Sequence, residues 1–126
     1  MNKQDIINIF NKEFSVIKDK FTITDVSVSE ASNSNIDNIW KPGVYVFLHP
    51  QRGVIRVGRS FENARKRALQ HIPANTGGKM ADLISNREAR LILFNVISKE
   101  DYFWVAALEV YLEKELSPEV PAGRQG

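Results

Sequence analysis

Two short apolar runs joined by a tight turn place the strongest constraint on how this chain folds. Residues 44–49 read VYVFLH and residues 54–58 read VIRVG, and both are rich in the β-branched and aromatic residues that favour strands. The segment between them contains Pro50 and Gly53, which are typical of tight turns. The pattern therefore predicts a β-hairpin.

The rest of the chain alternates between helical and strand-like spacing. Apolar steps of three and four residues predict helices. They are expected at residues 3–18, from near Phe61 to Pro73, and at 100–116, with a further short helix at 80–85. Ser60 or Asn63 can cap the helix that begins near Phe61. Runs rich in β-branched and aromatic residues predict strands at 90–98 and, more briefly, at 21–28, and a loop rich in Ser and Asn covers 29–38.

The order β-β-α-(α)-β-α over residues 40–117 is typical of a mixed α/β domain. With 126 residues, the chain has the length of one ordinary domain. We predict an α/β (α+β) fold in which a small central mixed three-stranded sheet is flanked by helices. The expected organisation is an N-terminal helical extension at 1–38, the main domain at 39–118 and a flexible C-terminal tail at 119–126.

Composition excludes several classes of protein. The absence of cysteine excludes disulfide scaffolds, thiolate metal sites and cysteine nucleophiles. The longest apolar run, from Tyr102 to Leu108, is far shorter than the roughly 20 residues of a membrane-spanning helix. Charged residues interrupt the N-terminus, so it does not resemble a secretory signal. We therefore expect a soluble, cytoplasmic protein with no membrane partner.

Basic residues gather between Arg52 and His71, although the whole chain carries a formal charge of only +2. They are Arg52, Arg56, Arg59, Arg65, Lys66 and Arg67, with Glu62 the one acidic residue among them. Such a patch suits a phosphate-bearing partner, because Lys and Arg that pair with phosphates release counterions. The alternative is an ordinary solvated helix face.

Three side chains could carry chemistry in addition to packing. Tyr45 alternates with its apolar neighbours and therefore faces the opposite side of its strand, where its hydroxyl needs a partner if it is buried. Arg67 and His71 are four residues apart and share one helix face; there an arginine can bind a phosphate oxygen and a histidine can relay a proton. Tyr45 could equally be a half-buried strand residue, and the Arg67–His71 pair a solvent-exposed one.

Glu109 lies in the apolar row of the last predicted helix, together with Val105 and Leu112. Carboxylates are rarely buried unless they are paired or hold a cation. The residue is therefore either a ligand for Mg²⁺ or Mn²⁺, or a rim residue or arginine partner. Gly58, at the end of the second hairpin strand, is expected to allow a tight turn and the close approach of a bulky partner.

Taken together, these residues resemble the GIY-YIG nuclease domain. The resemblance covers residues 40–118. It consists of Gly43-Val44-Tyr45, then Arg56-Val57-Gly58 after the hairpin, then Arg67 and His71 on the following helix, and finally Glu109. The chain departs from the family pattern in three ways: Arg56 replaces the second tyrosine, one extra residue before the helix makes Arg65 a rival of Arg67, and Pro118-Glu-Val-Pro121 lacks the family's asparagine.

The resemblance implies a metal-dependent endonuclease that hydrolyses a DNA phosphodiester bond with one divalent cation, Mg²⁺ or Mn²⁺. Tyr45, assisted by His71, would activate water, while Arg67 would stabilise the phosphate and Glu109 would hold the cation. Arg56, together with Arg59 and Arg67, would lower the pKa of the phenol. The nucleic acid would contact Arg52, Arg59, Ser60, Arg65 and Lys66.

Two other functions stay open. The chain could be a catalytically degraded module of the same type that binds nucleic acid or a protein without cutting, which the replacement by Arg56 favours. It could also be an unrelated α/β interaction domain in which Tyr45, Arg67 and Glu109 lie far apart. If it is a nuclease, a domain with one active centre has to form a homodimer or act twice to cut both strands.

Overall fold

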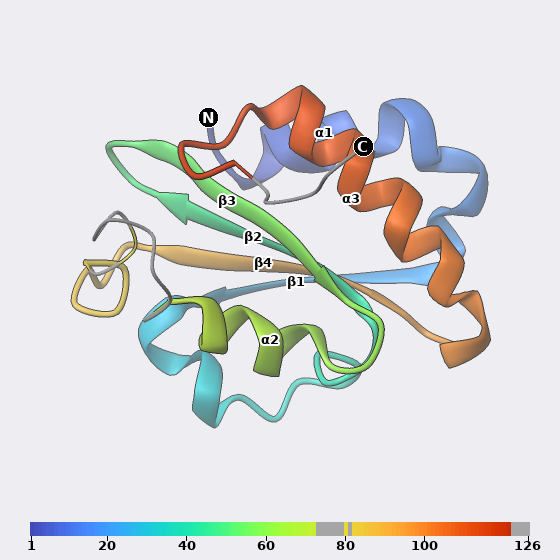
Figure 1. The fold of residues 1–126 in the computed structure, drawn as a ribbon, viewed down its shortest axis with the longest axis horizontal. Helices are drawn as coiled ribbons and strands as arrows, with labels where there is room; N and C mark the ends of the chain where they lie inside the picture. The colour runs from blue at the N-terminus through green and yellow to red at the C-terminus, as the bar shows by residue number, and fades with distance from the viewer. Residues whose placement is uncertain (73–79, 81, 122–126) are drawn as a thin grey trace.

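The computed structural model describes residues 1–72, 80 and 82–121, apart from the side chain of His71. Within them, four strands form one sheet: β1 (Phe21–Ser27), β2 (Gly43–His49), β3 (Gly53–Ser60) and β4 (Arg90–Val96). The spatial order is β1-β4-β2-β3, and each neighbouring pair is antiparallel. Figure 1 shows the sheet at the centre of the molecule.

The predicted α/β class and the β2–β3 hairpin are confirmed, but the prediction of a mixed, three-stranded sheet is wrong. β1 pairs with β4 along its whole length, from Phe21 opposite Val96 to Ser27 opposite Arg90. Without β1, β4 would be an edge strand with unpaired backbone N–H and C=O groups. The sheet has no parallel neighbours because β3 and β4, which run in the same direction, lie on opposite sides of β2.

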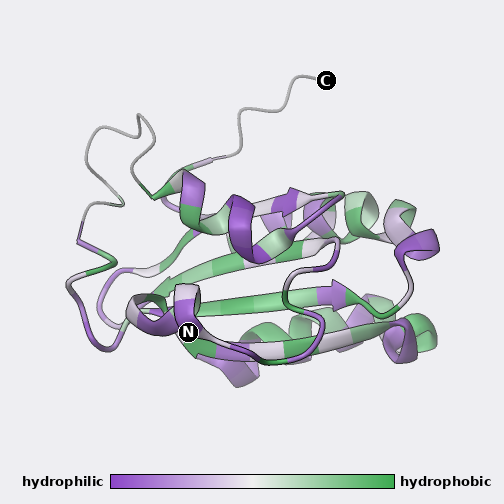
Figure 2. Cartoon of the chain, turned by 90° about the horizontal axis from the view of Figure 1, so that it is seen from below, coloured by the Kyte–Doolittle hydropathy of each residue, from purple (hydrophilic) through white to green (hydrophobic). Residues whose placement is uncertain are grey.

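Helices cover both faces of the sheet (Figures 1 and 2). The helices α1 (Lys3–Phe14) and α3 (Tyr102–Leu116) share one apolar core with strand residues such as Val44 and Val46. The other face packs against α2 (Ala64–His71) and the short 3-10 helix η2 (Val28–Asn33). Side chains alternate between the two faces along each strand. Tyr45 faces away from Val44 and Val46, as predicted, and points to the α2 side.

Local hydrogen bonds set the helix boundaries. α1 begins with a reciprocal cap between Asn2 and Asp5 and gives way at Phe14 to a 3-10 segment, η1 (Ser15–Lys20), so the predicted helix ends earlier than residue 18. α2 begins at Ala64 and is capped by Asn63. Ser60, the other expected cap, instead accepts hydrogen bonds from the backbone N–H groups of Glu62 and Asn63.

The predicted short helix at 80–85 is wrong: the described residues of this segment form turns. Asp82 is bound by tertiary partners, His49 and Arg52, at the end of the hairpin. Asn86 accepts a hydrogen bond from the backbone of Glu88. These side-chain contacts favour a turn over a helix.

The two terminal segments both contact the sheet. Residues 1–38, which we expected to be an extension, contribute β1 to the sheet and α1 to the core. Residues 119 and 120 donate backbone hydrogen bonds to Val54 and Ile55 of β3. The rest of the expected tail, 122–126, lies outside the described residues. None of the helices described is long and apolar enough to span a bilayer.

Candidate functional site

The site is centred on Tyr45, whose side chain is fully buried on β2. Tyr45 lies directly opposite Gly58 of the edge strand β3. A Cβ atom at position 58 would overlap Cζ and Oη of the tyrosine. Glycine is therefore required here to admit the phenol. The space that we predicted for a bulky partner is filled by this ring.

Three charged side chains act electrostatically on the Tyr45 hydroxyl: Arg56 of β3, Arg67 of α2 and Glu109 of α3. Arg56 also donates a hydrogen bond to the phenol. Because electrostatic interactions weaken with distance, each of these three groups lies near the Tyr45 hydroxyl, although they come from three elements other than β2. The structure thus brings together most of the predicted catalytic residues.

The pKa of Tyr45 changes in the direction opposite to the predicted one. Burial raises it to about 12, and the nearby Glu109 adds to the rise. Arg56 and Arg67 oppose the rise but do not outweigh it. Desolvation dominates because a phenolate in an apolar setting loses its hydration. At neutral pH the phenol therefore keeps its proton and can donate a hydrogen bond.

Arg67 and Arg65 have different surroundings, although both belong to α2. Arg67 is exposed and acts electrostatically on Tyr45. Arg65 points elsewhere and donates a hydrogen bond of 2.7 Å to the backbone carbonyl of Ser34. Of the two rivals, Arg67 is therefore the one placed for chemistry at Tyr45.

A polar hollow of about 270 Å³ lies beside Arg67. It is lined by Ser60, Glu62, Asn63, Lys66, Arg67 and Gln70. Arg56, which does not line this hollow, has a buried Nε that makes no hydrogen bond with the described residues. Guanidinium and ammonium groups around a polar hollow suit a phosphate oxygen.

Glu109 is 4% exposed and lies in the apolar row of α3, as predicted. Its Oε1 accepts a hydrogen bond of 2.8 Å from Nη1 of Arg59, which forms an ion pair. Arg59 is therefore the arginine partner that the sequence analysis gave as one alternative for Glu109. The same arginine lies over the ring of Phe61, with Cζ 4.9 Å from the ring centroid.

The carboxylate of Glu109 is a suitable ligand for a divalent cation, because its oxygen atoms are hard donors. The other charged residues that act on Tyr45 are basic. Mg²⁺ is commonly held by one or two carboxylates, with water and substrate phosphate completing its shell. No cluster of three or more acidic or histidine side chains occurs in the described part of the chain, so Glu109 would act with such outside ligands. A cation here would share the carboxylate with Arg59 or displace it.

One predicted site residue, Arg52, is not part of this arrangement. Arg52 lies in the hairpin turn, where it pairs with Glu119 and Asp82 at 2.9 Å each. It stabilises the turn and lies away from Tyr45. His71 ends α2, but its side chain lies outside the described residues.

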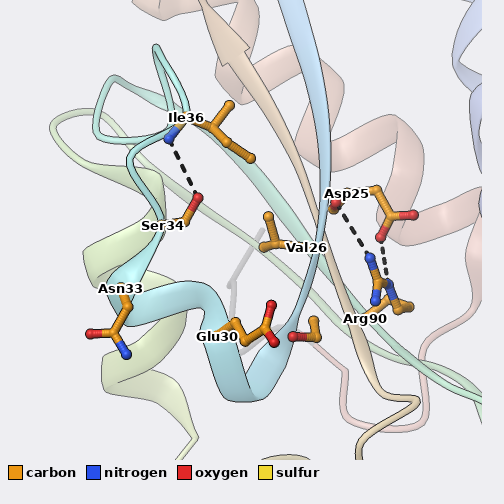
Figure 3. A pocket seen from close by; sticks show the side chains of 8 residues that line it. Asp25, Val26, Glu30, Asn33, Ser34, Ile36 and Arg90 are labelled. Carbon is orange, nitrogen blue, oxygen red and sulfur yellow. Dashed lines mark hydrogen bonds and ion pairs between the residues drawn. The ribbon is translucent and has the colours of Figure 1, made fainter.

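Two further polar clusters lie apart from the site. The buried His49 accepts backbone hydrogen bonds at Nδ1 from Gln51 and Arg52. Its proton is therefore on Nε2, which faces Asp82 at 3.1 Å and fixes the hairpin end. The other cluster lines a hollow of about 360 Å³ between β1, η2 and β4 (Figure 3), where Arg90 pairs with Asp25 at 2.8 Å.

The aromatic run at 102–104 is the feature that the sequence analysis missed. Three consecutive aromatic residues on a helix cannot all face one core, and Tyr102 and Phe103 are indeed exposed.

Comparison with known proteins gives no family: no protein-family model, curated protein or solved structure matches this chain.

Proposed function

We propose that this chain is a divalent-cation-dependent endonuclease that hydrolyses a DNA phosphodiester bond. The observation that supports the proposal is the convergence of Arg56, Arg67 and Glu109 on the buried Tyr45 hydroxyl. These groups come from separate elements, and together they offer a proton donor, phosphate-binding cations and a carboxylate ligand. Phosphodiester hydrolysis assisted by a metal ion uses cations that stabilise the phosphate and a ligand that holds the metal.

Arg67 binds and stabilises the phosphate in this proposal. It is exposed, permanently charged and placed beside a polar hollow. As water attacks phosphorus, negative charge accumulates on the non-bridging oxygens, and a fixed guanidinium stabilises it without reorganising. Lys66 and Ser60, which line the same hollow, hold the neighbouring phosphate oxygens.

Tyr45 orients the attacking water alongside a separate base. Its pKa of about 12 keeps the phenol protonated at neutral pH, so its O–H fixes the position of the water by a hydrogen bond. Arg56 donates to the phenol oxygen and thereby holds the ring hydroxyl in place. His71, one helical turn after Arg67 in sequence, is the proposed acceptor of the water's proton, since a neutral imidazole can act as a general base.

Glu109 would hold the cation, which would supply Lewis-acid stabilisation of the leaving 3′-oxygen. The P–O bond to that oxygen breaks as the bond from water forms, and the oxygen then takes up a proton from solvent. Arg59 neutralises Glu109 in the structure. A cation that displaced Arg59 from the carboxylate would leave the guanidinium available to the phosphate backbone.

The test is a plasmid-nicking assay with Mg²⁺ that compares Glu109→Gln with a matched control on the same helix, Glu115→Gln. Glu115 is exposed, whereas Glu109 is buried. We expect Glu109→Gln to lose at least about 100-fold in nicking rate while keeping the wild-type circular dichroism spectrum, and Glu115→Gln to keep its activity. A folded Glu109→Gln variant with full activity would show the assignment to be wrong.

A second candidate is a module that binds nucleic acid without cutting it. The Arg59–Glu109 ion pair favours this candidate, because an arginine already satisfies the carboxylate that would hold the cation. The same assay separates the two: wild-type protein that binds DNA but leaves plasmid uncut over a range of Mg²⁺ and Mn²⁺ concentrations is the non-cutting module. The third candidate is an unrelated interaction domain, in which Tyr45, Arg67 and Glu109 would lie far apart. The electrostatic action of Arg67 and Glu109 on Tyr45 does not favour it.

A further inference from the structure

Three exposed aromatic side chains form one patch, here called the aromatic ledge: Phe61, Tyr102 and Phe103. Phe61 lies between β3 and α2, and the other two lie in the first turn of α3. Phe61 meets Tyr102 edge to face at 5.9 Å, and Tyr102 meets Phe103 edge to face at 6.0 Å. They are exposed by 45%, 51% and 54%.

Packing alone does not explain the ledge. Within the described residues, four aromatic side chains are exposed, and three of them belong to this patch. The buried row of α3 begins only at Val105, so the rings at its first turn do not contribute to the core. A contiguous exposed apolar patch of this kind typically marks a binding surface.

Arg59 connects the ledge to the candidate site. One of its guanidinium nitrogens contacts Glu109, and the guanidinium lies over the Phe61 ring. The ledge is therefore continuous with the phosphate-binding residues proposed above. A ligand that covers both regions has to present a flat apolar surface beside negative charge.

We propose that the aromatic ledge stacks unpaired bases of a nucleic-acid strand whose backbone occupies the candidate site. This inference rests on the proposed function and specifies its substrate class: single-stranded or locally unpaired nucleic acid. Stacking on Phe and Tyr accepts every base, since each has a flat π-face. A regular duplex keeps its bases stacked on each other and offers none to the ledge.

Charge favours this occupant over a protein partner. Lys66 and Arg67 are exposed on α2 and line one polar hollow with Ser60, the residue between Arg59 and Phe61. Their charges match a phosphodiester backbone. Single-strand-binding surfaces combine these two features, a row of cations and a row of rings.

The test measures binding of the full-length chain by fluorescence anisotropy in EDTA, so that no cleavage occurs. The probes are a labelled thymidine oligonucleotide of about 16 nucleotides and a duplex of equal length. We expect the wild type to bind the single strand at least ~5-fold more tightly than the duplex. Tyr102→Ala and Phe103→Ala should each weaken single-strand binding by about 5- to 100-fold.

Two control variants show whether the loss of an aromatic ring is what weakens single-strand binding. Tyr102→Phe keeps the ring and should bind within about twofold of wild type. Ile84→Ala removes another exposed apolar side chain, two residues after Asp82, which pairs with Arg52 at the hairpin end. It should leave binding unchanged.

Unchanged single-strand binding by the alanine variants overturns the inference, and so does a wild type that prefers the duplex. Self-association that disappears in Phe103→Ala, measured by light scattering, also overturns it, because the ledge is then a protein interface. The nicking assay with Glu109→Gln reports separately on the proposed function. Ring-dependent binding without nicking refutes hydrolysis alone, and nicking with ring-independent binding refutes the ledge alone.

Discussion

The raised pKa of Tyr45 predicts that the protein loses stability at alkaline pH. Below pH 10 both the folded and the unfolded chain hold the phenol proton, so this group contributes no pH dependence. Between pH 10 and about 12 the unfolded chain releases the proton while the folded chain keeps it. Unfolding is therefore favoured progressively as pH rises through this window.

The magnitude follows from the size of the difference between the two pKa values. Each pKa unit corresponds to about 1.4 kcal/mol, so the free energy of unfolding should fall by about 2–3 kcal/mol across the window. The loss is complete above the folded-state pKa, because both states are then ionised. This is a sizeable part of the stability of a small domain, typically about 5–15 kcal/mol.

The assay is urea unfolding from roughly pH 8 to pH 12, followed by circular dichroism, for wild type and Tyr45→Phe. Phenylalanine cannot ionise, so subtracting the two curves removes the contributions of Tyr111, whose pKa burial also raises, and of the lysines. We expect the free energy of unfolding of the wild type, minus that of Tyr45→Phe, to fall by about 2–3 kcal/mol between pH 10 and 12. A difference that stays flat, or that grows with pH, would refute the conclusion that burial outweighs the arginines.

Three further predictions concern the same site. Gly58→Ala should destabilise the fold by about 1–3 kcal/mol in urea unfolding, and Tyr45→Leu should relieve much of that cost in the double variant, because the added Cβ overlaps the phenol end of the tyrosine; equal costs in both backgrounds would contradict the contact. Arg67→Gln should lower the nicking rate by about 100-fold, and more than Arg65→Gln does, since Arg65 is bound to a backbone carbonyl; the reverse order in a plasmid assay would exchange their roles. Arg59→Gln should lower the Mg²⁺ concentration needed for half-maximal nicking, because it removes the ion pair with the cation ligand; an unchanged or higher requirement would exclude such competition.

The sequence predicted the parts of the fold that depend on local pattern. The hairpin turn, the alternation that turns Tyr45 away from Val44 and Val46, and the apolar row containing Glu109 all follow from spacing along one element. The contribution of β1 could not be predicted in this way. Its pairing with β4 joins residues that are far apart in sequence, and the pattern of one strand does not identify its neighbour.

The parts of the site that the sequence could not predict depend on opposing physical effects or on contacts with distant segments. Charges near Tyr45 were visible in the sequence, but the balance between those charges and burial was not, so the direction of the pKa shift was wrong. The choice between Arg65 and Arg67 depended on the carbonyl of Ser34, which belongs to a loop without any periodic pattern. The turn at 82–85 similarly depends on partners in the hairpin.

The edge position of β3 explains why the candidate site lies where it does. An edge strand presents unpaired backbone groups and has to be covered or made unattractive to other strands. Near Val54 and Ile55 the backbone of residues 119 and 120 covers this edge. Toward the other end, the described residues make no further backbone pairing with that side of β3, and the strand carries Arg56, Gly58 and Arg59 there. Charge protects this half of the edge from pairing with another strand, and the same charge makes it suited to a polyanion.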